Sequence, residues 1–200
     1  GVTVTGLPTG VTATTSGNTV TITGTPSTTT GSPFSYSIVT TGGSCGTTTL
    51  NGTITVNPNV SLILNSAANT TNQTICGSTN ITPISYTFGN GATGVTVTGL
   101  PTGVNFTTSG NNVTISGTPS TTTGSPFSYT ISTTGGTCGN ATLNGTITVN
   151  SNPTLVLSSA VATTSQSVCI NTPINTISYT FGGSATGVTV TGLPTGVTAT

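Results

Sequence analysis

The chain has 200 residues and contains no Asp, Glu, Lys, Arg or His, so its formal net charge at pH 7 is zero. General acid–base catalysis needs a side chain that titrates near the working pH, and a nucleophilic serine or cysteine needs a neighbouring base. Calcium and most zinc sites need carboxylate or imidazole ligands, and binding to nucleic-acid phosphates needs Lys or Arg. We therefore expect no catalytic residue, no cofactor, no metal and no nucleic-acid partner in these residues, and we interpret the segment as non-enzymatic.

One stretch of eleven residues, GVTVTGLPTGV, occurs three times, at 1–11, 94–104 and 187–197, with a constant interval of 93 residues. Solenoid repeats have roughly 20–50 residues, whereas a small β-sandwich domain has about 100. The period therefore predicts a string of near-copies of one sandwich domain. We expect a complete copy at 58–150, the C-terminal part of a preceding copy at 1–57 and the N-terminal part of the next copy at 151–200, all cut from a longer repetitive polypeptide.

Within the complete copy, apolar residues alternate with Thr and Ser in short runs, and Gly, Asn and Pro separate the runs. Alternation with a period of two, interrupted by turns about every 8–12 residues, is typical of an all-β sandwich. No stretch has helical periodicity, and none is apolar for long enough to cross a membrane. We expect seven or eight strands, at 60–64, 74–76, 84–88, 95–97, 104–106, 113–115, 127–132 and 141–149.

The aromatic residues occur in pairs spaced by two, so that both rings of a pair lie on one face of a strand. Such a pair could form a platform on which sugars stack, or it could belong to the core. We favour the core, because Ile84 and Ile131 lie on the same faces, and we expect the tyrosine hydroxyls to meet backbone at the edge of the sandwich. The pairs are Phe34/Tyr36, Tyr86/Phe88, Phe127/Tyr129 and Tyr179/Phe181.

The outward faces of the predicted strands consist of Thr and Ser, and no charged residue protects the sheet edges. Natural sheets usually guard their edges with charges, especially Lys. We therefore expect lateral assembly with other copies of the same chain, unless glycan covers these edges.

Four cysteines keep the 93-residue period: Cys45, Cys76, Cys138 and Cys169. Two thiolates in each copy make a poor zinc site, and in an oxidising compartment the spacing indicates one disulfide per domain. We predict a bridge Cys76–Cys138, with Cys45 and Cys169 pairing outside this segment. If the strands next to these two cysteines run parallel, the thiols are too far apart. Bridges Cys45–Cys76 and Cys138–Cys169 between neighbouring domains, or bridges between chains, are then the alternatives.

Asn-x-Ser/Thr sequences are abundant and become glycosylated only in a cell with the machinery to do so. The candidate asparagines are Asn51, Asn59, Asn69, Asn72, Asn80, Asn105, Asn112, Asn140 and Asn144.

Two sets of motifs resemble known families. GLPTGVNFTTSGNNVTISGTP, followed by SPFSYTIST, resembles the immunoglobulin-like repeats of bacterial surface proteins. QTIC…TPISYTF and SVCINTPINTISYTF, with TGGTCG…LNGTITVN, resemble the repeats of very long secreted Bacteroidota proteins. The resemblance implies an immunoglobulin-like fold, one cysteine pair per domain, secretion by the type IX system and a role in adhesion or surface filaments. Some relatives bind calcium through acidic loops, which this sequence lacks.

We therefore predict an extracellular or cell-surface location and a structural role. The repeats would form the shaft of a long bacterial surface fibre used in attachment, gliding or cell capture. The alternative is that each repeat is itself a multivalent adhesin or lectin-like module that binds surface glycans, since loops of Thr, Ser, Gly and Asn bind weakly unless many act together.

Overall fold

The computed structural model describes residues 1–200 and is all-β, apart from two single turns of 3₁₀ helix, η1 (Ala68–Thr71) and η2 (Val161–Thr164). All eight strands expected in 58–150 are present, which confirms the alternation read from the sequence. The chain forms two compact units. One comprises Gly1–Leu62, Phe88–Thr96 and Ser132–Thr142, and the other comprises Ile63–Thr87, Val97–Ile131 and Leu143–Thr200. No helix in the structure is both long and apolar enough to span a lipid bilayer.

The N-terminal strands form two small antiparallel sheets. One is the three-stranded sheet of β1 (Val2–Thr5), β4 (Phe34–Thr40) and β5 (Thr49–Ile54), in the order β1-β4-β5. The other is the hairpin of β2 (Val11–Ser16) and β3 (Thr19–Gly24). At the C-terminus, β14 (Thr154–Leu157) pairs with β15 (Tyr179–Gly182).

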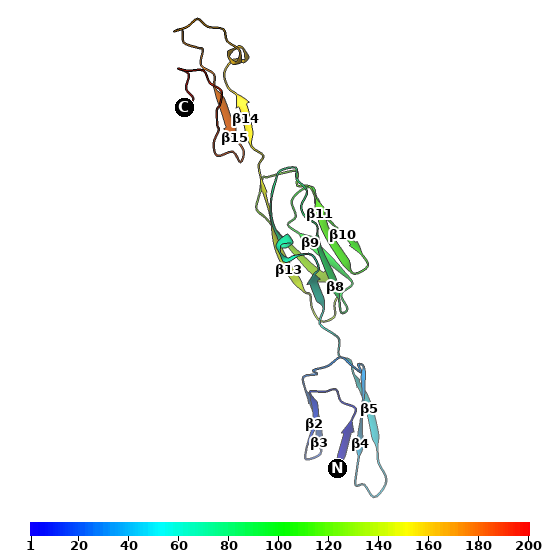
Figure 1. The fold of residues 1–200 in the computed structure, drawn as a ribbon. Helices are drawn as coiled ribbons and strands as arrows, with labels where there is room; N and C mark the ends of the chain where they lie inside the picture. The colour runs from blue at the N-terminus through cyan, green and yellow to red at the C-terminus, as the bar shows by residue number, and fades with distance from the viewer. The chain divides into compact units, whose positions relative to one another are not determined.

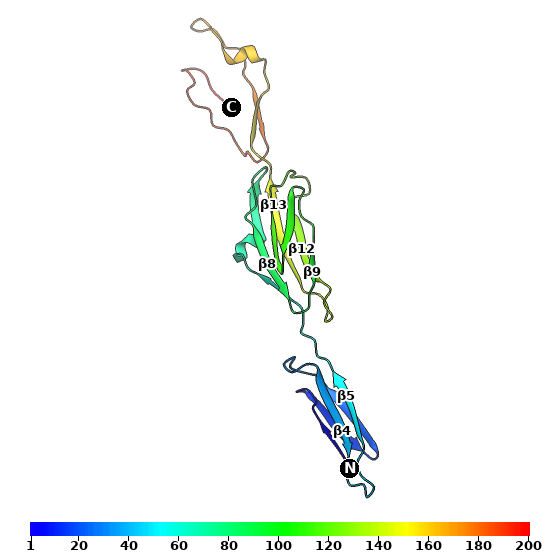
Figure 2. The ribbon, with the colours of Figure 1, turned by 90° about the vertical axis from the view of Figure 1, so that its right-hand side faces the viewer.

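The remaining strands form two four-stranded sheets. The first has the order β10-β11-β8-β6 and contains β10 (Val104–Ser109), β11 (Asn112–Gly117), β8 (Ile84–Gly89) and β6 (Ser61–Leu64) (Figure 1). The second has the order β7-β13-β12-β9 and contains β7 (Asn72–Cys76), β13 (Thr142–Asn150), β12 (Phe127–Thr134) and β9 (Gly94–Thr98) (Figure 2). β7 runs parallel to β13, with Asn72 opposite Thr146 and Cys76 opposite Asn150.

The core lies between these two sheets, because both sheets turn their apolar side chains inward. In β8 every second residue is buried, and the Ser and Thr between them are half-buried. Removing one such side chain from water stabilises the fold by about 1.5–3 kcal/mol. The buried apolar residues on the strands are Ile84, Tyr86, Phe88, Val104, Val113, Ile115, Tyr129, Ile131, Ile147 and Val149.

The same residues are exposed where a copy of the repeat is incomplete. Tyr86 is 0% exposed, whereas its equivalent Tyr179 is 54% exposed. Phe88 and its equivalent Phe181 are 4% and 45% exposed. In the closed core, Tyr86 on β8 meets Tyr129 on β12 of the opposite sheet. The core of 58–150 is therefore built from both halves of one period.

Two glycines of the repeat lie at positions where a side chain would collide with its neighbours. Gly99, in the turn GLPTG, has a φ of +81°, and a Cβ there would collide with the carbonyl oxygen of Ser128. Gly145 lies on β13 against the ring of Tyr129, and a Cβ there would overlap the ring atoms. A side chain at Gly145 would thus push Tyr129 out of the core.

Candidate functional site

Tyr86, Phe88 and Tyr129 belong to the core, as expected. Phe34, Tyr36 and Phe127 are half-buried, and Tyr179 and Phe181 are exposed. Tyr86 on β8 and Tyr129 on β12 are fully buried, and their hydroxyl oxygens are 3.0 Å apart. The expectation that these hydroxyls meet backbone was wrong, because each tyrosine finds its partner in the opposite sheet. This hydrogen bond satisfies two polar groups that would otherwise destabilise the core, and no buried side-chain N or O atom in the structure lacks a partner.

Burial raises the pKa of both hydroxyls above the ordinary tyrosine value, because it disfavours the phenolate. For Tyr129 the contact with the Tyr86 hydroxyl raises the pKa further. Both phenols therefore stay neutral over the physiological range, and the pair is structural rather than reactive.

A second polar cluster was not anticipated from the sequence. The amide nitrogen of Gln73 donates to the carbonyl oxygens of Thr70 and Thr82, at 2.7 and 2.8 Å, and its amide oxygen accepts from Thr82 N at 2.7 Å. Gln166 makes the same three bonds in the following copy, to Thr163 and Asn175. The only signal in the sequence is that a Gln stands three residues before each of Cys76 and Cys169.

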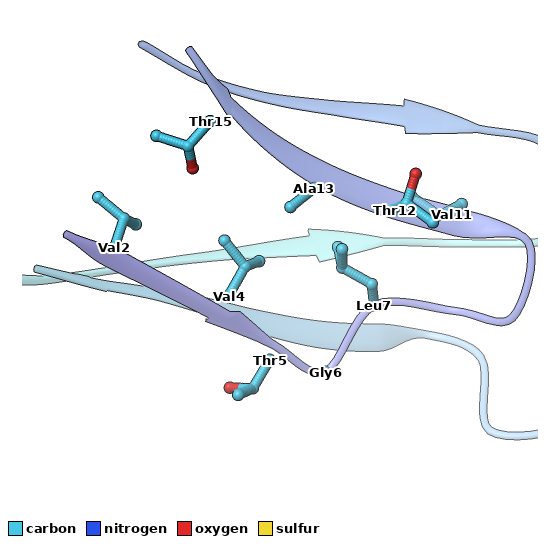
Figure 3. Close-up of a pocket in the computed structure, with 9 residues that line it drawn as sticks. All are labelled: Val2, Val4, Thr5, Gly6, Leu7, Val11, Thr12, Ala13 and Thr15. Atoms are coloured by element: carbon cyan, nitrogen blue, oxygen red, sulfur yellow. The ribbon is translucent and has the colours of Figure 1, made fainter. Parts of the chain in front are cut away.

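A hollow lies between β1 and β2. Val2, Val4 and Leu7 point from one side toward Ala13 on the other, as Figure 3 shows. The equivalent of Ala13 one period later is Phe106, which is 36% exposed. The lining of the hollow offers only threonine hydroxyls and backbone as polar groups, so it has no group for catalysis or for metal binding.

The cysteines are all exposed, and the structure separates the predicted pair. Cys76 ends β7 opposite Asn150, the last residue of β13, whereas Cys138 precedes the first residue of β13. The nine residues of β13 span about 30 Å, and a disulfide needs Cα atoms within about 7 Å. The bridge Cys76–Cys138 within one copy therefore does not fit this topology; the parallel arrangement of β7 and β13 is the reason.

All nine candidate glycosylation asparagines are exposed. Two of them already take part in cross-strand bonds: Asn112 Oδ1 accepts from the Thr87 hydroxyl and Asn144 Oδ1 accepts from the Thr130 hydroxyl, both at 2.8 Å. Glycosylation remains a prediction for each site.

No protein-family model and no curated protein matches the sequence. Among solved structures, the chain is similar to the protocadherin GammaB4 extracellular domain, with 14% identity and a TM-score of 0.50, over 91% of this chain and 32% of that one. Two titin structures, one of tandem Ig domains, match at 9% and 7% identity over 70% and 73% of this chain and 75% and 76% of theirs, each with a TM-score of 0.37. The likeness to the protocadherin domain concerns the fold alone. The chain is all-β, and two four-stranded sheets form its central β-sandwich.

Loss of one hydroxyl of the tyrosine pair should destabilise the complete copy. We expect Tyr129→Phe to lower the free energy of unfolding by about 1–3 kcal/mol, because the Tyr86 hydroxyl is then buried without a partner. Adding Tyr86→Phe should cost less than the sum of the two single changes. Urea unfolding followed by circular dichroism measures this cycle, with the exposed Tyr179→Phe as the control. Strictly additive losses would contradict the pairing.

The stability of the chain should depend on pH only in alkaline solution. The raised pKa of Tyr86 and Tyr129 favours the neutral form in the folded state. Their contribution is thus complete below the unfolded pKa of about 10 and is lost as the pH rises above it. Urea midpoints should be level from about pH 4 to 8, where no carboxyl, imidazole or amino side chain titrates, and should fall above about pH 10. A loss of stability between pH 4 and 6 would be the opposite of this expectation.

Proposed function

We propose that the chain is a structural segment of a long extracellular bacterial surface fibre, in which 93-residue sandwich repeats follow one another as the shaft. The complete repeat is 58–150, and 1–57 and 151–200 are parts of its neighbours. The buried hydrophobic residues run from Ile81 to Val149, which supports a complete repeat within 58–150.

The observation that carries the proposal is where the chain enters and leaves the repeat. Asn57 and Val60, at the start, contact the hairpin of Gly136 and Cys138 that precedes β13. The repeat ends at Asn150, the last residue of β13. Start and end thus lie at opposite ends of one strand, and each copy advances the chain by the strand's length, about 30 Å.

The surface supports contact between several such chains. The edge strands are β10 and β6 in one sheet and β7 and β9 in the other. β10 is exposed along all but its first residue and carries Phe106, which is 36% exposed. No charge on these edges opposes pairing with another copy. Other copies of the same chain are therefore the proposed lateral partners.

The proposed extracellular location is based on two likenesses. The protocadherin structure is that of an extracellular domain. The repeat motifs resemble those of secreted Bacteroidota surface proteins, so secretion by the type IX system is part of the proposal. The absence of acidic, basic and imidazole side chains supports a non-enzymatic role.

Electron microscopy of the surface of cells that produce the protein tests the proposal. We expect filaments with an axial repeat of at least about 30 Å, the length of β13. They should persist in about 1 M salt, because the segment has no ion pairs for salt to screen. Compact particles, or filaments that dissolve in salt, would contradict the shaft. Single strings that clump only when a surface glycan is added would favour the binding module instead.

A further inference from the structure

Cys138 lies where the chain enters its repeat. It sits in the hairpin between β12 and β13, and its Sγ donates to the carbonyl oxygen of Asn57 at 3.5 Å. Gly136 of the same hairpin packs against the side chain of Val60. The hairpin therefore rests on the segment that arrives from the preceding copy.

Cys76 lies where the chain leaves the same repeat. It ends β7 in register with Asn150 of β13. The next residue, Gly77, donates its backbone N–H to the carbonyl oxygen of Asn150 at 2.8 Å. Cys76 is thus beside the residue from which the following copy departs.

Asn57 and Asn150 are the same residue of the repeat, one period apart. Cys138 contacts the carbonyl oxygen of Asn57 at the joint before its copy, and Gly77 contacts the carbonyl oxygen of Asn150 at the joint after that copy. These two oxygens are therefore equivalent atoms of successive joints. When a complete copy follows Asn150, its equivalent of Cys138 contacts the oxygen that already binds the neighbour of Cys76. Both cysteines would then lie beside the same carbonyl oxygen, and a disulfide between them requires Cα atoms within about 7 Å.

We propose that a disulfide joins Cys76 of each copy to the equivalent of Cys138 in the following copy, and that Cys138 is joined in the same way to the preceding copy. The bridge locks every joint of the array covalently. It explains why both thiols are exposed and why one copy cannot close its own pair. The inference rests on the geometry of the repeat and holds whether or not the array serves as a shaft.

The pairings Cys45–Cys76 and Cys138–Cys169 between neighbouring domains would join ends that do not meet at a joint. Cys45 is the equivalent of Cys138 and lies between β4 and β5, where its own copy begins. Its partner therefore belongs to the copy before it, and Cys76, at the far end of the following copy, is not that partner. By the same argument, Cys138 does not pair with Cys169. Cys138 lies where its copy begins, whereas Cys169 is the equivalent of Cys76 and lies at the far end of the following copy.

The chemistry is an ordinary thiol oxidation. The two thiols lose two protons and two electrons as the S–S bond forms. The acceptor is the disulfide of an oxidising thiol–disulfide exchange protein, which is reduced to two thiols. Such proteins act in extracytoplasmic compartments, which agrees with the proposed location.

The test is a chain extended after Thr200 by the sequence of residues 15–57, which completes the third copy with one added cysteine. Cys45→Ser and Cys138→Ser remove two thiols, so that Cys76 and Cys169 compete for the added one. After expression in an oxidising compartment, peptide mapping without reductant should find Cys76 linked to the added cysteine and Cys169 free. A link from Cys169 to the added cysteine, or no bridge at all, would overturn the proposal.

A matched control is the same extended chain with Cys76→Ser. We expect both remaining thiols to react with a thiol reagent in the folded protein, with the circular dichroism spectrum unchanged. If Cys169 and the added cysteine then form a bridge, a single copy can close its own pair and the proposal fails. Filaments seen by microscopy would be unaffected by that failure, so the two proposals are tested separately.

Discussion

The contact between β8 and β12 across the core is the constraint on which the rest of the structure depends. Tyr86 and Tyr129 bring one hydroxyl each into an apolar interior, and each is the other's partner at 3.0 Å. The two tyrosines come from opposite halves of the period, so neither half can satisfy its own hydroxyl or cover its own apolar face. Tyr179 and Phe181, which are not covered by a second sheet, are 54% and 45% exposed.

Hydroxyl and amide pairs replace ion pairs on the outer faces of the sheets. Thr87 bonds to Asn112 across β8 and β11, and Thr130 bonds to Asn144 across β12 and β13. Such neutral bonds are each worth about 0.5–1.5 kcal/mol and are not screened by salt. A fold built from apolar burial and neutral hydrogen bonds is insensitive to conditions that weaken salt bridges.

The alternation of apolar residues with Thr and Ser was enough to predict the strands and the core, because burial on one face of a strand leaves a period of two in the sequence. It could not predict which strands become neighbours. The parallel pairing of β7 with β13 joins residues at opposite ends of the repeat, and no local signal encodes it. That pairing decides where Cys76 lies relative to Cys138, so the sequence alone could not decide which cysteines pair. The bond between Tyr86 and Tyr129 was missed for the same reason.

Hydrogen exchange measured by mass spectrometry tests most directly the claim that a full period closes the core. Residues 1–57 match 94–150 at 48 of 57 positions, so the intrinsic exchange rates of equivalent peptides are nearly equal. In the fraction that light scattering shows to be monomeric, amides of β11 and β12 should exchange far more slowly than those of their equivalents β3 and β4. Equal protection of the two sets in the monomer would contradict the account, because half a period would then be sufficient to form the stable fold.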